Sequence, residues 1–105
     1  MQGAKNKRLE AAGWRVGDAA EFLELTPEET AFIELKLALA RHLRDVRVAH
    51  DWTQLQVARK LGSSQSRVAK MEAADASVTV DLLLKSLLAL GASRDELGRV
   101  ISMAA

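Results

Sequence analysis

Apolar residues in this chain recur at helical spacing, and no alternating pattern typical of strands persists beyond a few residues. The segment from Pro27 to about Ala49 is predicted to be one long helix, because Thr26 and Glu29 can form a capping box around Pro27. Its apolar residues follow one another at intervals of three or four, which predicts a single buried stripe. The stripe consists of Phe32, Leu35, Leu39, Leu43 and Val46.

Four shorter helices are predicted after this one, each beginning at a serine or threonine. Thr53 with Gln56 forms a second capping box, and Ser93 with Glu96 a third. Two of the helices are predicted to end at glycine, because Gly62 and Gly91 occupy positions at which a helix commonly ends with a left-handed backbone conformation. The predicted helices begin after Thr53, Ser64, Thr79 and Ser93, and the last one frays past Ser102.

The segment before Pro27 carries weaker signals. Asp18 and Glu21 fit a short helix through Leu23, residues 13–17 suit an extended arm, and residues 5–8 are expected to be disordered. We therefore divide the chain into an extension, residues 1–25, and one domain, residues 26–102.

Composition limits the class of protein. The chain has 105 residues, 49% of them hydrophobic and 28% charged, which suits one globular core. It has no cysteine and no apolar run of the roughly 18 residues that cross a bilayer, so we expect a cytoplasmic protein without membrane contact. His42 and His50 lack a second ligand at metal spacing and are expected at the surface or core edge, so no metal or cofactor is predicted. No motif for catalysis is present, and we expect no enzyme.

Charge is distributed unevenly along the chain, although the net charge is only +1. Residues 17–35 contain six acidic residues and no basic one. Residues 36–70 contain eight basic residues against two acidic ones, for a net charge of +6. A basic segment of this kind is typical of a phosphate-binding surface, although solvated helix faces give the same pattern.

Two short helices separated by a glycine-containing turn, as predicted for residues 53–72, are the pattern of a helix-turn-helix. Ala58 suits the close crossing of the two helices, and the wedge between them is expected to hold Val57, Leu61, Val68 and Met71. The string WTQLQVARKLGSSQSRVAKME resembles the XRE family, the DNA-binding domains of the λ repressor and Cro type, over most of residues 40–95. The resemblance implies an all-α, five-helix λ repressor-like domain. Two positions depart from the family pattern: Ser63 replaces an aliphatic residue, and Ala73-Ala74 replaces Asn-Gly after the second helix.

The resemblance also implies roles for individual residues. Thr53 and Gln54 would meet a phosphate, and the second helix would present its outward side chains to base edges. Arg67 suits guanine, Gln65 suits adenine and Ser66 suits either. Arg59 and Lys60 fit phosphate contacts or solvated charges equally well. The DNA-binding set is Thr53, Gln54, Arg59, Ser64, Gln65, Ser66, Arg67 and Lys70.

Arg47 and Glu72 are expected to have a structural role. In the XRE family an arginine late in the first helix pairs with a glutamate that ends the recognition helix, and these two residues occupy those positions. Such a pair would hold the two helices together. Both tryptophans, Trp14 and Trp52, are predicted to pack rather than stack on bases. Trp52 precedes the Thr53 capping box, where a hydrophobic staple is expected.

Three functions remain open from the sequence. The first is a sequence-specific transcriptional regulator, specifically a repressor, that binds double-stranded DNA as a homodimer, since one module reads few base pairs. The second is an antitoxin: the segment ahead of the motif is similar to that of HigA-like antitoxins found beside RelE/HigB-type toxins, and its acidic residues suit a basic toxin partner. The third is a protein-binding scaffold that has lost affinity for DNA.

Overall fold

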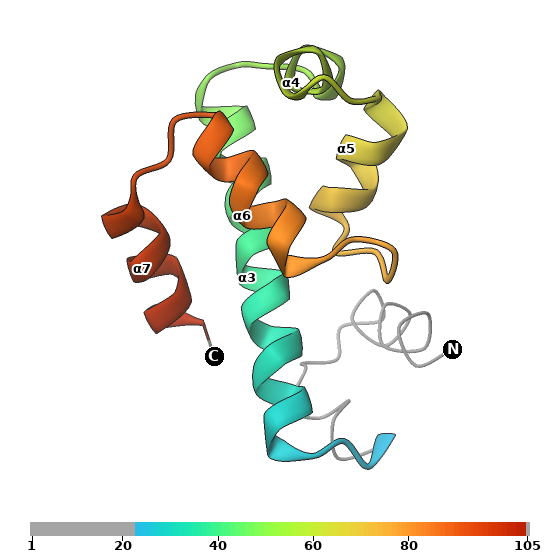
Figure 1. Cartoon of the computed structure of the whole chain (residues 1–105), viewed down its shortest axis with the longest axis vertical. Helices are drawn as coiled ribbons and strands as arrows, with labels where there is room; N and C mark the ends of the chain where they lie inside the picture. Colours follow the sequence, from blue (N-terminus) through green and yellow to red (C-terminus); the bar gives the residue numbers. More distant parts are fainter. Residues whose placement is uncertain (1–22, 105) are drawn as a thin grey trace.

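The computed structural model describes residues 23–104. Within this range the chain forms five helices and no strand, so the predicted all-α class is confirmed (Figure 1). The helices are α3 (Pro27–Ala49), α4 (Gln54–Leu61), α5 (Gln65–Glu72), α6 (Val80–Ala89) and α7 (Arg94–Met103). The helix predicted from Asp18, the arm at residues 13–17 and Trp14 lie outside the described residues.

The core lies where the shorter helices meet the carboxyl-terminal half of α3. The helices α5, α6 and α7 all contact α3, and α4 packs against α5 and α6 (Figure 1). Helix α7 adds Leu97 to this core, and Ala92 and Val78 enter it from the loops. Burial of these apolar side chains is the main force that holds the five helices together. The fully buried larger side chains are Leu39, Leu43, Val57, Val68, Met71, Leu83 and Leu87.

Phe32 does not lie in this core, contrary to the predicted stripe. Its side chain is 55% exposed, whereas Leu39 and Leu43 further along the same stripe are fully buried. The reason is length: α3 has 23 residues and α6 and α7 have 10 each. At about 1.5 Å per residue, α3 is about 35 Å long and its partners about 15 Å. The first turns of α3 therefore extend past α6 and α7, as Figure 1 shows.

All five helices begin at a hydroxyl side chain that accepts a hydrogen bond from the backbone N–H three residues later. The N-caps are Thr26, Thr53, Ser64, Thr79 and Ser93. The predicted boxes Thr26–Glu29 and Thr53–Gln56 are closed in both directions. The box predicted at Ser93 is half formed: the hydroxyl accepts from the Glu96 N–H, but the Glu96 carboxylate contacts His42 on α3 instead.

Four of the helices end in the same way. A residue with positive φ stands at or directly after the C-cap of α3, α4, α5 and α6, namely Asp51, Gly62, Ala74 and Gly91. At the end of α4 the N–H of Ser63 donates to the carbonyl of Ala58, at 2.8 Å, and the N–H of Gly62 to that of Arg59, at 3.3 Å. The same pair of bonds recurs at the other three ends, which makes each a Schellman motif. The predicted helix ends at Gly62 and Gly91 are confirmed by this geometry.

Candidate nucleic-acid interface

The helices α4 and α5 pack against each other across the Schellman turn at Gly62. Ala58 is 1% exposed, so the helices approach closely at the position predicted for their crossing. Val57, Val68 and Met71 are buried between the helices and the rest of the core, and Leu61 is partly buried against it. Two short helices held in this way at a tight turn form a helix-turn-helix unit.

Helix α5 divides into a buried and an exposed face. Val68 and Met71 point into the core, and Ala69 is half-buried. The side chains on the other face are exposed, and none makes a hydrogen bond or ion pair with another residue between 23 and 104; they are Gln65, Ser66, Arg67 and Lys70. This is the set of base readers inferred from the sequence, and the structure brings the four together on one surface.

The amino terminus of α4 lies beside the end of α5. The Thr53 hydroxyl accepts from the Gln56 N–H at 3.1 Å, and the Gln56 side chain accepts from the Thr53 N–H at 2.8 Å. The Gln54 side chain donates to Glu72 Oε1 at 3.3 Å. Both residues predicted to meet a phosphate therefore have partners within the protein. The first N–H groups of α4 after the cap have no partner inside the helix, as at any helix start.

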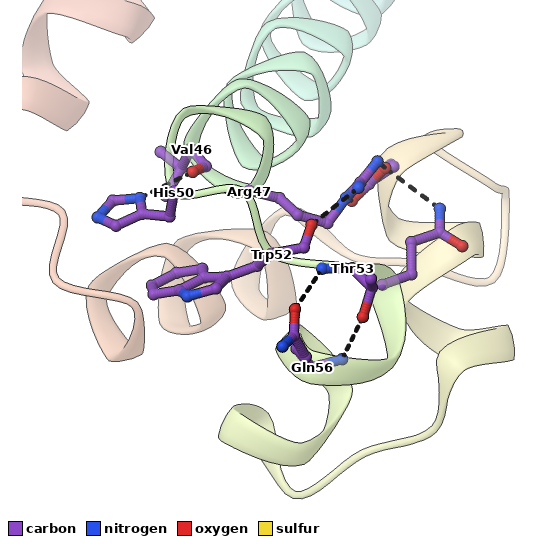
Figure 2. A network of polar contacts seen from close by, with 8 residues as sticks. Val46, Arg47, His50, Trp52, Thr53 and Gln56 are labelled. Carbon is purple, nitrogen blue, oxygen red and sulfur yellow. Dashed lines mark hydrogen bonds and ion pairs between the residues drawn. The ribbon is translucent and has the colours of Figure 1, made fainter.

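Arg47 and Glu72 form a two-bond ion pair between α3 and α5 (Figure 2). Arg47 Nε donates to Glu72 Oε2 at 2.6 Å, and Nη2 donates to Oε1 at 3.0 Å. Arg47 Nη1 donates to the Trp52 carbonyl at 3.2 Å. With Gln54, this network joins the end of α3, the loop to α4, the start of α4 and the end of α5. We call these four residues, Arg47, Trp52, Gln54 and Glu72, the clamp.

The Arg47–Glu72 pair of the clamp is largely shielded from water, with exposed side-chain fractions of 18% for Arg47 and 6% for Glu72. The hydrogen bonds to Glu72 raise the pKa of Arg47 above its ordinary value, against the opposing effect of burial. The arginine is therefore charged at every pH at which the protein is folded. The participation of Gln54 was not predicted, because sequence spacing does not indicate which carboxylate a glutamine side chain will reach.

Trp52 lies in a stack of three side chains at the loop between α3 and α4. The His50 ring stacks on it at 4.2 Å between centroids, and the Lys60 ammonium lies 4.5 Å from the centre of the Trp52 ring. His50 Nδ1 donates to the Val46 carbonyl at 2.9 Å, which orients the imidazole (Figure 2). Trp52 also packs against the core, consistent with a packing role. Lys60 thus has a partner in the protein, whereas Arg59 is exposed with none among residues 23–104.

Neither a metal-binding cluster nor a membrane-spanning helix is found among residues 23–104. No group of three or more potential metal-ligating side chains occurs among residues 23–104. His42, expected at the core edge, is half-buried and bonds to Glu96 at 2.5 Å. In the part of the chain that the structure describes, no helix has the length and hydropathy to cross a membrane.

Fold and surface together define a helix-turn-helix unit with one exposed polar and basic face. The helix-turn-helix family model matches residues 43–97, just over half of the chain and the region from the last two turns of α3 to the start of α7. The chain therefore belongs to the helix-turn-helix family, whose common property is DNA binding. No curated protein and no solved structure matches the chain.

Proposed function

We propose that this protein is a sequence-specific transcriptional regulator that inserts α5 into the major groove of double-stranded DNA. The observation that carries the proposal is the two-faced character of α5. Its buried face fixes the helix to the core, while Gln65, Ser66, Arg67 and Lys70 extend into solvent with no partner between residues 23 and 104. Polar side chains held ready on a rigid helix are what recognition of base edges requires.

The side chains divide by the chemistry that they offer. Arg67 has a planar donor fork that fits guanine O6 and N7, a contact worth about 1–3 kcal/mol of discrimination. Gln65 matches adenine, Lys70 matches guanine as arginine does, and Ser66 can bind more than one base. The end of α5 cannot tilt freely in the groove, since the clamp holds Glu72 against α3.

Phosphate contacts are assigned to the start of α4 and its exposed face. The unpaired N–H groups that follow Thr53, with the second amide hydrogen of Gln54, form a donor group suited to a phosphate oxygen. Arg59 adds an exposed cation on α4, and Ser64, at the N-cap of α5, offers its hydroxyl. These contacts would position the domain without reading sequence.

We further propose that the protein binds as a homodimer and acts as a repressor. One helix-turn-helix covers few base pairs, and a pair of copies on a palindromic site separated by one helical turn supplies the missing selectivity. Analytical ultracentrifugation with and without operator DNA tests this stoichiometry; one chain per operator would contradict it.

Selection from a random DNA library, followed by affinity measurements on the enriched and a scrambled sequence, tests sequence-specific binding. Replacing Arg67 and Ser66 together by alanine is expected to remove most of the difference between the two sequences. Arg94→Ala is the control, because Arg94 is also an exposed arginine and lies on α7, which packs mainly on α3. Unchanged selectivity in the double variant would refute the assigned readers.

A second candidate function is that of an antitoxin, which is compatible with DNA binding. The observation in its favour is the surface at the start of α3, where Glu24, Glu28 and Glu29 are exposed and Phe32 is 55% exposed. Acidic residues beside an exposed aromatic suit a basic protein partner such as an RNA-cleaving toxin. This surface lies ahead of the residues matched by the family model.

Co-purification with the product of the neighbouring gene tests the antitoxin hypothesis. A tight complex that weakens with salt and with Glu24→Gln/Glu28→Gln supports it. Absence of any complex leaves a regulator that acts alone. Asp81→Asn/Asp95→Asn, two exposed acidic residues on α6 and α7, is the charge-matched control.

A further inference from the structure

A hollow of about 390 Å³ lies between the α4–α5 turn and α6, within the range of volumes typical of small-ligand sites. The turn supplies Gly62 and Ser63, and α6 forms the facing wall. Ser63 is half-buried, and its short side chain leaves this space unfilled. The lining residues are Lys60, Leu61, Gly62, Ser63, Arg67, Met71, Leu82, Lys85, Ser86 and Ala89.

The inner part of the hollow is apolar except for one buried hydroxyl. Leu61, Met71 and Leu82 belong to the core or pack against it. Ser86 is only 5% exposed, and its hydroxyl has one partner among residues 23–104, the Met71 sulfur at 3.6 Å. A thioether is a weak acceptor, and it leaves both lone pairs of the hydroxyl oxygen unused. The Ser86 oxygen can therefore still accept a hydrogen bond from an N–H or O–H group attached to the body of a ligand.

Three cations line the hollow, and they differ in how strongly they are engaged. Arg67 is exposed and has no partner among residues 23–104. Lys85 pairs with Asp81 at 3.6 Å, but both side chains are more than three-quarters exposed, so the pair is weak. Lys60 lies over the Trp52 ring. The lining contains these three cations and no carboxylate, and Arg67 offers the planar fork that binds carboxylate or phosphate oxygens in pairs.

We propose that this hollow binds a small organic anion with an apolar body, of the class of aromatic or short aliphatic carboxylates and sulfonates. The apolar part contacts Leu61, Met71 and Leu82, and the charged group binds Arg67 and Lys85 at the opening. Because Arg67 also belongs to the proposed reading face, the bound anion competes with DNA for this side chain. The competition rests on the proposed function, whereas the binding of the anion does not.

Titration of the DNA-free full chain with anilinonaphthalene sulfonate, a fluorescent aromatic sulfonate, tests the site. In a Trp14→Phe background Trp52 is the sole tryptophan, so energy transfer from Trp52 reports probe bound to the domain, and substitutions at the hollow locate it. We expect saturable binding of one probe per chain. Lys85→Ala is expected to weaken it about fivefold, the size of effect for one exposed cation. Arg94→Ala, an exposed arginine on α7, is the charge-matched control and is expected to change nothing.

Ser63→Leu is the complementary variant, because a leucine at the turn fills the hollow. It is expected to abolish saturable binding while the circular dichroism spectrum stays helical. If this variant unfolds, Lys85→Ala still tests the site, because Lys85 is exposed and its replacement is not expected to unfold the chain. Binding that does not saturate, or that Lys85→Ala and a folded Ser63→Leu both leave intact, would overturn the proposed site.

A final titration addresses the competition. Saturating probe is expected to weaken binding of the selected DNA by the parent chain and to leave the Ser63→Leu variant unaffected. Equal DNA affinity with and without bound probe would overturn the competition but not the site. Failure of DNA binding itself is distinguishable, since the probe titration contains no DNA.

Discussion

Arg47 connects more parts of the domain than any other single side chain in the network of Figure 2. Its guanidinium reaches the Trp52 carbonyl and both carboxylate oxygens of Glu72, and Gln54 donates to the same carboxylate. A planar fork with five N–H donors is needed for this, and lysine cannot replace it. The clamp therefore sets the orientation of α5 relative to α3.

Replacing Glu72 by glutamine is expected to lower the free energy of unfolding by about 2 kcal/mol, because Arg47 would keep its charge in a poorly solvated place. Urea denaturation measures this through the transition midpoint. Asp81→Asn, which breaks the exposed pair with Lys85, is the matched control and is expected to have almost no effect. An equal loss in both variants would contradict the role of the clamp.

The double variant Arg47→Met/Glu72→Met removes both charged side chains of the pair at once. Its loss of stability is expected to be smaller than the sum of the two single losses, since no unpaired charge remains inside. Additive losses would mean that the two side chains stabilise the fold independently.

At the scale of the element, the four Schellman endings use two kinds of residue for one backbone conformation. Gly62 and Gly91 adopt positive φ without strain, whereas Asp51 and Ala74 adopt it with a Cβ atom, at φ of 55° and 51°. A Cβ built on Gly62 meets nothing within 4 Å, so an alanine there would be limited by backbone conformation alone.

Replacing glycine by alanine at one of these helix ends, and alanine by glycine at another, is expected to change the free energy of unfolding in opposite directions. Gly62→Ala should destabilise the fold by about 1 kcal/mol, and Ala74→Gly should stabilise it by up to about 1 kcal/mol, reduced by the lost packing of the half-buried methyl group. Thermal unfolding of the two variants beside the parent chain checks both signs. The same sign for both would rule out φ as the cause.

The contact between α7 and α3 makes the stability of the fold depend on pH. The hydrogen bond from His42 is the largest cause that lowers the pKa of Glu96 from its ordinary value of 4.5, and burial opposes it. Folding thus favours the ionised carboxylate. The resulting stability is complete above pH 4.5 and is lost as the pH falls through the lowered pKa.

Glu96→Gln is therefore expected to be less stable than the parent chain near neutral pH, with a difference that shrinks as the pH falls below 4.5. Urea midpoints measured across this range give the difference directly. Asp95→Asn, an exposed neighbour in the first turn of α7, controls for the general effect of removing a charge at a helix start. A constant difference at every pH would contradict the His42–Glu96 contact.

At the scale of the whole molecule, the electrostatic part of DNA binding should be visible in its salt dependence. Arg59→Ala is expected to weaken binding of every sequence to a similar degree and to lower the slope of log affinity against log salt by about 0.9. Arg67→Ala is expected to act mainly on the preferred sequence. An unchanged slope would identify Arg59 as a solvated charge.

Helix positions were predictable from the sequence because each start has a hydroxyl cap and each apolar stripe has helical period, as Thr53 and Val57 illustrate. The exposed face of α5, which we propose reads bases, was predictable from the same period, because Val68 and Met71 define the inner side of this helix. The contacts of Gln54, Lys60 and Glu96 were not predictable, since each joins elements whose relative placement depends on tertiary packing. The exposure of Phe32 was missed because periodicity does not indicate where a covering helix ends.

The length of α3 beyond its covering helices has a consequence for amide hydrogen exchange. Opening the turns around Phe32 exposes little further apolar surface, whereas opening those around Leu39 and Leu43 requires the core to separate. Protection within this one continuous helix should therefore rise from its first turns toward Arg47, where exchange approaches the rate set by global unfolding. A single helix would thus contain both the least and the most protected backbone of the domain.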